Sequence, residues 1–155
     1  KEYDKAMEDY TKAIELDAGY AVGYYNRGNA HKSIREYDKA IEDYTKAIEL
    51  DADYVYVYNG RGNAYYDLKE YDKAMEDYTK AIELDADYVY AYTGLGNCYY
   101  MKQQYKEAED NYTKAIELDK DYKLAYKNRA MAYRKLGKVE EALADENRVK
   151  ELEEK

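Results

Sequence analysis

The chain has 155 residues and a formal net charge of −9, and this length suits one ordinary domain. With one Cys, one His and no Pro, Trp or Phe, the composition excludes a disulfide framework, a Cys/His zinc site and a site built on two histidines. All 24 aromatic residues are tyrosine, so tyrosine is expected to build much of the core. Apolar runs are far shorter than the roughly 20 residues that cross a bilayer, and no targeting segment is readable, so we expect a cytoplasmic protein without membrane contact.

The chain repeats itself every 34 residues. The segment EYDKAMEDYTKAIELD, which starts at Glu2, recurs from Glu36 with one change, from Glu70 unchanged and from Gln104 in a looser form. In each copy, apolar residues lie three and four positions apart, which is typical of a helix with one buried face. The segments between copies predict a second helix, and short turns such as Asp-Ala-Asp-Tyr join the two. We call the helix of the intervening segment helix A and that of the repeated segment helix B.

In chain order, the pattern predicts one all-α array over residues 1–155. It consists of a helix B without a helix A at 1–17, full units at 21–54, 55–88 and 89–122, and a terminal unit at 123–155. The last helix has Glu146 and Lys150 where the other units have Tyr and Ile, so we expect it to cap the array with a polar face.

The first helix keeps an apolar stripe that a helix A would cover. The stripe consists of Tyr3, Tyr10, Ala13 and Ile14. Because the chain also begins with Lys1 rather than Met, we expect a cut N-terminus. An exposed stripe of this kind predicts self-association through the first helix.

A 34-residue helix-turn-helix unit of this kind resembles the tetratricopeptide repeat (TPR) family. The residues that carry the resemblance in the second full unit are Tyr58, Gly62, Tyr65, Ala74, Tyr78 and Ala81. Two features depart from the family pattern, since Tyr stands where Trp is common and Ala or Lys where Pro usually follows helix B. The resemblance covers essentially the whole chain. It implies a right-handed superhelical α-solenoid in which helices A line a concave surface that binds peptide segments of partner proteins.

Features that suggest catalysis or a cofactor have simpler structural interpretations. The Gly-x-Gly pair at 60–62 lies inside helix A rather than after a strand, so we expect it to allow close helix packing. Asp51 and Asp53 lack the following Gly and Glu of a calcium loop, and a turn explains them better. Cys98 and His31 take positions that small or aromatic core residues hold in other units. We therefore expect no catalytic residue, no metal and no cofactor, and the chain is not expected to be an enzyme.

A repeated pair of opposite charges predicts an ion pair inside each unit. An Arg on helix A precedes an Asp on helix B by 16 residues in Arg27 and Asp43, Arg61 and Asp77, and Arg129 and Asp145. The remaining unit has Leu95 and Asn111 in these places. Because both partners change together, we interpret them as structural pairs. The alternative is that the arginines bind a ligand.

The open face of helix A is the candidate peptide-binding groove. Its residues are Asn29, Tyr56, Asn59, Asn63, Tyr66, Tyr90, Asn97, Tyr100, Met101, Lys127, Asn128, Arg134 and Lys135. Tyr rings can stack on side chains, Asn amides can hydrogen-bond a peptide backbone, and the cations near the C-terminus can attract a carboxylate. A merely solvated helix face is the alternative interpretation.

Charge and spacing narrow the expected partners. The acidic chain lacks the cationic footprint that nucleic acids need. Some TPR proteins bind the acidic C-termini of chaperones with a carboxylate clamp of Lys and Asn side chains and an Arg, but from the first full unit only Asn29 matches that set. The sequence thus predicts a noncatalytic scaffold for protein or peptide segments, without clamp-type chaperone binding. The alternative is a structural or self-assembling repeat array, natural or designed, without a dedicated ligand.

Overall fold

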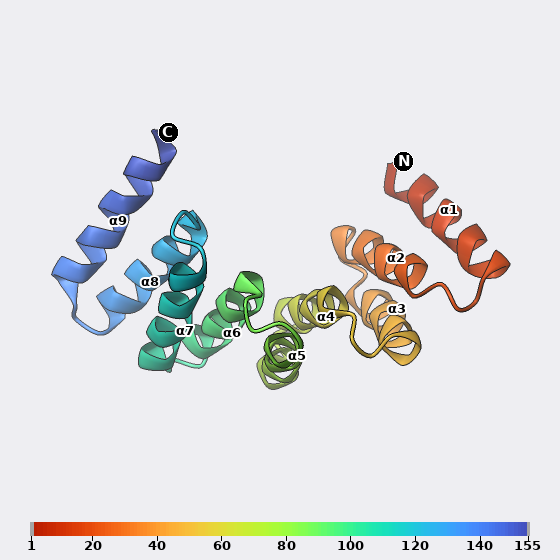
Figure 1. Ribbon diagram of the computed structural model, residues 1–155, viewed down its shortest axis with the longest axis horizontal. Coiled ribbons are helices and arrows are strands. Elements are labelled where there is room, and N and C mark those ends of the chain that lie inside the picture. Colours follow the sequence, from red (N-terminus) through yellow and green to blue (C-terminus); the bar gives the residue numbers. More distant parts are fainter. Residues whose placement is uncertain (1, 155) are drawn as a thin grey trace. The chain divides into compact units, whose positions relative to one another are not determined.

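The computed structural model describes the backbone of residues 2–154 and the side chains of residues 5–154. This part of the chain forms helices and no strand (Figure 1). The helices are α1 (Glu2–Leu16), α2 (Ala21–Ser33), α3 (Tyr37–Leu50), α4 (Val55–Asp67), α5 (Tyr71–Leu84), α6 (Val89–Met101), α7 (Tyr105–Leu118), α8 (Lys123–Lys135) and α9 (Val139–Glu153). Even-numbered helices are helices A and odd-numbered ones are helices B, so the predicted all-α repeat fold is confirmed.

The chain divides into two compact units, Lys1–Asp85 and Ala86–Lys155. In the first unit, α2 packs against α3 and α4 against α5, while α1 and α3 also pack against the helix A that follows each of them. In the second unit, α6 packs against α7, α7 against α8, and α8 against α9. Successive helices A are also in contact within a unit, α2 with α4 and α6 with α8. One array over residues 1–155 stays a prediction.

The turn inside each helix pair contains one residue with left-handed backbone. These residues are Arg35 (φ 64°), Lys69 (φ 63°), Gln103 (φ 63°) and Gly137 (φ 76°). The N–H of the next residue donates to a helix A carbonyl five positions back, as from Glu70 to Tyr65 at 2.9 Å. This bond satisfies a carbonyl at the helix end that would otherwise have no partner. The turn therefore ends helix A sharply and directs the chain back along it.

The turns that join successive repeats, from a helix B to the next helix A, use aspartate side chains. The Oδ1 atoms of Asp17, Asp51 and Asp119 accept hydrogen bonds from backbone N–H groups two residues on, at 2.9 to 3.1 Å. A short carboxylate fixes such a turn because it replaces a backbone acceptor. The interpretation of the paired aspartates as turn residues is confirmed.

The core of each unit is built on tyrosine, as predicted. Tyr44, Tyr78 and Tyr112 are at most 1% exposed and are the largest fully buried side chains of the described residues. Each lies under a glycine of its own helix A, and a Cβ added at Gly62 would come within 2.9 Å of Tyr78 Cε1. Glycine is therefore required here despite costing a helix about 1 kcal/mol.

The first and last helices differ in what covers them. In α9, Ala142, Asp145 and Val149 are buried against α8, while Lys150 is exposed. In α1, Ile14 is buried, but Tyr10 and Ala13 are only half-buried. The side chain of Tyr3, the remaining member of the predicted stripe, lies outside the described residues.

Candidate functional site

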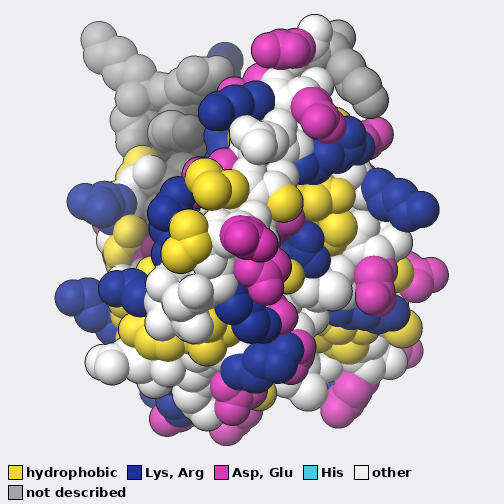
Figure 2. Space-filling model, turned by 90° about the vertical axis from the view of Figure 1, so that its left-hand side faces the viewer, with side chains coloured by type: hydrophobic (Ala, Val, Ile, Leu, Met, Phe, Trp, Pro, Cys, Tyr) yellow, Lys and Arg dark blue, Asp and Glu magenta, His cyan; other side chains and the backbone are white. Residues whose placement is uncertain are grey.

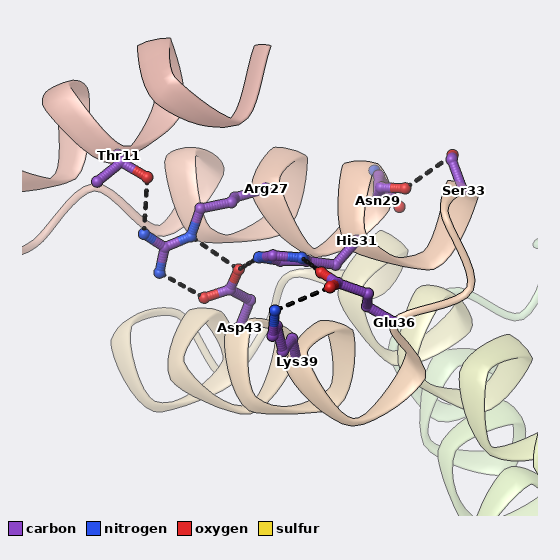
Figure 3. A network of polar contacts seen from close by, with 8 residues as sticks. All are labelled: Thr11, Arg27, Asn29, His31, Ser33, Glu36, Lys39 and Asp43. Atoms are coloured by element: carbon purple, nitrogen blue, oxygen red, sulfur yellow. Dashed lines mark hydrogen bonds and ion pairs between the residues drawn. The ribbon is translucent and has the colours of Figure 1, made fainter. Parts of the chain in front are cut away.

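Each predicted Arg–Asp pair is joined by two hydrogen bonds. The Nε and Nη2 atoms of Arg27, Arg61 and Arg129 donate to the two carboxylate oxygens of Asp43, Asp77 and Asp145 at 2.7 to 2.9 Å. The third guanidinium nitrogen, Nη1, donates to Thr11, Thr45 or Thr113 of the preceding helix B at 3.0 to 3.2 Å. Figure 3 shows this arrangement around Arg27, between Thr11 and Asp43. One arginine thus connects three helices.

These arginines have a structural role rather than an open ligand site. All three guanidinium nitrogens are engaged, and the guanidinium carbon also lies 5.6 to 5.9 Å from the ring centre of Tyr24, Tyr58 or Tyr126. The Thr partner was missed at the sequence level. The signal was present, because a Thr precedes each Arg by 16 residues.

The single histidine belongs to the first of these networks. His31 Nδ1 lies 2.7 Å from Glu36 Oε2, and its Nε2 lies 3.8 Å from Asp43 Oδ2 (Figure 3). Lys39 donates to the other Glu36 oxygen at 2.8 Å. The hydrogen bonds from Lys39 and His31 lower the pKa of Glu36. These contacts give His31 a structural setting.

The Asn residues of helix A are oriented by the core tyrosines. The Oδ1 atoms of Asn29, Asn63 and Asn97 accept hydrogen bonds from the hydroxyls of Tyr44, Tyr78 and Tyr112 at 2.7 to 2.8 Å. In the residues that the structure describes, none of these three Nδ2 groups has a hydrogen-bond partner of its own. Each Asn therefore carries a held acceptor and a free amide donor. The sequence signal was an Asn 15 residues before a Tyr, with both replaced in the terminal unit by Met131 and Glu146.

One helix A amide is left with an unused acceptor. Asn59 Oδ1 is shielded from solvent and has no hydrogen-bond partner, and it is the one such atom in the described side chains. Asn59 lies one helical turn before Asn63 on α4, so the two share a face.

Tyrosines give this face its apolar surface. Tyr56 on α4 and Tyr90 on α6 are 54% and 57% exposed. Tyr66 and Tyr100 contribute less than predicted because they are half-buried, with ring centres 5.5 and 5.3 Å from Tyr71 and Tyr105 of the following helices B. Met101 is exposed at the end of α6.

Three predicted groove residues of α8 are engaged within the second unit. Asn128 is buried rather than open, because its Nδ2 donates to Asn97 Oδ1 at 2.9 Å. Lys127 forms an ion pair with Glu153 at 3.0 Å, and Arg134 forms one with Glu146 at 2.7 Å. The last helix therefore neutralises much of the predicted basic end. Among these candidates, Lys135 is exposed and has no described ion pair.

Two further features of the charges went unnoticed in the sequence. Glu109 of α7 is buried and accepts from Lys138 Nζ at 2.7 Å. Burial lowers the pKa of Lys32, although the charge of Asp67 opposes this.

On the side shown in Figure 2, basic and acidic side chains are interspersed rather than gathered by sign. We call the exposed or half-buried candidates on helices A the helix A surface of each compact unit. They are Asn29, Tyr56, Asn59, Asn63 and Tyr66 in the first unit, and Tyr90, Asn97, Tyr100, Met101, Lys127, Arg134 and Lys135 in the second.

The described side chains contain no group of three or more His, Cys, Asp or Glu that could hold a metal ion. None of the described helices is long and apolar enough to cross a membrane. Cys98 is buried in α6. Along helices A, the described side chains offer hydrogen bonding and apolar contact.

The helix pairs and the helix A surface define a repeat scaffold of the helix-turn-helix type. The chain belongs to the tetratricopeptide repeat family. Family models described as "Tetratricopeptide repeat" match residues 21–54, 89–122 and 111–144, and one described as "TPR repeat" matches 1–34 and 62–103. Curated protein sequences give no significant match.

Solved structures show the same fold. A crystal structure of MamA is 27% identical with a TM-score of 0.88, over 98% of this chain and 89% of that one. The first TPR of Spaghetti (RPAP3), bound to the HSP90 peptide SRMEEVD, is 27% identical with a TM-score of 0.74, over 78% of this chain and 96% of that one. MamA 41-end from Desulfovibrio magneticus RS-1, at 18% identity and a TM-score of 0.88, covers 98% of this chain and 86% of its own and is similar in fold.

Proposed function

We propose that this chain is a noncatalytic scaffold that binds extended peptide segments of partner proteins on its helix A surface. The observation that carries the proposal is the set of Asn amides whose Oδ1 atoms are fixed by core tyrosines while their Nδ2 groups stay unbonded. A donor held in place before binding loses little conformational entropy when a ligand arrives. Repeated donors of this kind suit a ligand with repeated acceptors, and a peptide backbone is such a ligand.

In the first unit, the surface offers a hydrogen-bond donor to a peptide backbone. Asn63 Nδ2 can donate to a peptide carbonyl. Because this group addresses the backbone, it holds peptides regardless of side chain. The exposed ring of Tyr56 adds apolar contact area at a low entropic cost.

In the second unit, the amide of Asn97 is combined with the exposed Tyr90 and Met101. Lys135 is the cation most available to a ligand carboxylate, since Lys127 and Arg134 already have partners on α9. We propose that acidic groups are preferred near α8, but less strongly than three free cations would give.

The peptide-bound TPR of Spaghetti supports peptide binding as a function of this fold. For this chain, we propose that the mode differs from a carboxylate clamp. The clamp positions of the first full unit and its successors hold Tyr25, Asn29, Gly60, Tyr90 and Gly94, and only Asn29 matches.

The test is a peptide-library screen, followed by affinity measurements on the double variant Asn63→Asp with Asn97→Asp. Aspartate keeps an oxygen for the tyrosine hydroxyls but removes the amide donors, so we expect affinity to fall about tenfold or more for peptides of any sequence. The matched control is Asn111→Asp, the same exchange on helix B, where the Asn donates to Glu107 of its own helix; it should leave affinity unchanged.

A screen without binders, or binders that ignore the double variant, would contradict the proposal. The first outcome favours a structural array without a dedicated ligand. Circular dichroism and the melting temperature of each variant confirm that the fold is retained.

A further inference from the structure

The amides that the core tyrosines hold offer a ligand a hydrogen-bond donor rather than an acceptor. Asn63 Oδ1 accepts from a tyrosine hydroxyl, and its Nδ2 group is left to donate. At Asn97, Oδ1 accepts from both Tyr112 and Asn128, at 2.8 and 2.9 Å, so both of its lone pairs are used. Asn59 Oδ1 has no partner, but it is shielded from solvent. These amides therefore suit a ligand that brings acceptors without donors.

Tyrosine rings hold one another in place in both units. In the first unit, the exposed ring of Tyr56 stands edge-on to Tyr54, with 6.0 Å between ring centres and 87° between planes, and Tyr54 lies 5.2 Å from Tyr25. In the second unit, Tyr90 stands in the same way against Tyr122, at 5.7 Å and 83°. Edge-to-face contacts of this kind favour one orientation of a ring. The two exposed rings are therefore ordered surfaces for an apolar group of a ligand.

Ring and amide lie two helical turns apart on the same face of one helix. Tyr56 and Asn63 are seven residues apart on α4, and so are Tyr90 and Asn97 on α6. Seven residues of α-helix rise about 10 Å. One turn of a polyproline II helix, which takes three residues, rises about 9 Å. A polyproline II segment along such a helix would place one residue on the ring and a carbonyl, one turn further, near the amide.

We infer that the ligand of the helix A surface is a proline-rich segment in the polyproline II conformation, an inference that rests on the proposed peptide-binding function. Proline has no backbone N–H, so its carbonyl is an acceptor without an accompanying donor. A polyproline II helix has no internal hydrogen bonds, and its carbonyls are free to accept from Asn63 or Asn97. Pyrrolidine rings supply the apolar groups that pack on Tyr56 and Tyr90. In each unit, we expect prolines that recur at every third residue.

Other backbone conformations fit these groups less well. An α-helical ligand uses its carbonyls in its own hydrogen bonds, so few remain for the asparagine amides. An extended segment of other residues brings an N–H with each carbonyl, and these N–H groups would lose water beside amides that offer them no acceptor. A proline-rich segment also loses little conformational entropy on binding, because its φ angles are fixed beforehand.

The test compares two labelled peptides of about ten residues, each titrated with the full chain and followed by fluorescence anisotropy. One is oligoproline, and the other alternates alanine and serine, which keep their backbone N–H groups. We expect oligoproline to bind at least about tenfold more tightly. Tyr56→Ala with Tyr90→Ala should weaken its binding about tenfold, whereas Tyr56→Phe with Tyr90→Phe keeps both rings and should change it less than about twofold.

Two further chains complete the comparison. Asn63→Asp with Asn97→Asp should also weaken oligoproline binding, because the carbonyls of the peptide lose their donors. The matched control for the ring variants is Tyr37→Ala, which removes a half-buried ring at the start of a helix B and should leave oligoproline binding unchanged.

Two outcomes would overturn the inference. One is oligoproline that binds no more tightly than the alanine–serine peptide, and the other is oligoproline binding that ignores both the alanine and the aspartate variants. The library screen separates this failure from failure of the proposed function. If the screen returns mainly proline-free peptides that depend on Asn63 and Asn97, the chain binds peptides but the proline-rich class is wrong. If no peptide binds, both proposals fail.

Discussion

Arg61 shows how much one side chain contributes to this fold. It extends from α4 and donates hydrogen bonds to Thr45 of α3 and to Asp77 of α5. Asp77 is almost fully buried, and burial raises its pKa although the hydrogen bonds from Arg61 oppose this. The carboxylate is therefore tolerated in the core largely because the arginine is there.

Removing only the arginine should be costly. We expect Arg61→Leu to lower the free energy of unfolding by about 3 kcal/mol, because it leaves a buried charge without a partner. Adding Asp77→Asn, which reproduces the Leu95 and Asn111 found in another unit, should bring the loss to about 1 kcal/mol. Urea denaturation measures both, and a double variant no more stable than Arg61→Leu would contradict this.

The free energy of unfolding of the Arg61→Leu variant should depend on pH. An acid whose pKa is raised in the folded state binds more protons folded than unfolded, so stability increases as pH falls toward the unfolded pKa near 3.9. The loss of unfolding free energy that Arg61→Leu causes, relative to the unchanged chain, should therefore be smaller at mildly acidic pH than at neutral pH. The double variant lacks this carboxylate and should show no such narrowing.

At the scale of the helix pair, the turn after helix A decides how sharply the chain reverses. Three of these turns place a residue with a β-carbon in left-handed backbone, and the fourth uses Gly137. The conformation costs such a residue about 1 kcal/mol, whereas glycine adopts it freely.

Lys69→Gly should stabilise the chain. We expect a gain of about 0.5 kcal/mol, because relief of the backbone cost exceeds the extra entropy that glycine gives the unfolded chain. Thermal unfolding should show a small rise in melting temperature, while Gly137→Lys should lower it. Lys69→Ala keeps the β-carbon and is the control; an equal gain from Ala would assign the effect to the lysine side chain instead.

The whole chain is acidic, and its charges bear on the choice of partner. The formal net charge is −9, and Lys127 and Arg134 on the helix A surface are paired with carboxylates of α9. Nucleic acid binding depends on cations that replace the counterions of phosphate.

Duplex DNA should therefore not bind detectably. Anisotropy titrations with a duplex of about 20 base pairs in about 150 mM salt should stay flat. Measurable affinity that falls steeply with added salt would contradict this expectation.

Sequence alone determined the helices, their period and the Arg–Asp pairs, because these features repeat at fixed positions. Apolar spacing of three and four residues defines a helical face, and the joint change to Leu95 and Asn111 identified the two partners. The family assignment depends on the same regularities.

Tertiary structure alone decided which of the predicted groove residues are available. Asn128 and Arg134 were both predicted to belong to the groove, and in the structure Asn128 donates to Asn97 and Arg134 pairs with Glu146. Both contacts join different helices, so their geometry depends on how neighbouring helices pack and not on the spacing within one helix. For the same reason, the identical sequences of α1 and α5 are covered to different extents, since burial depends on the presence of a neighbouring helix.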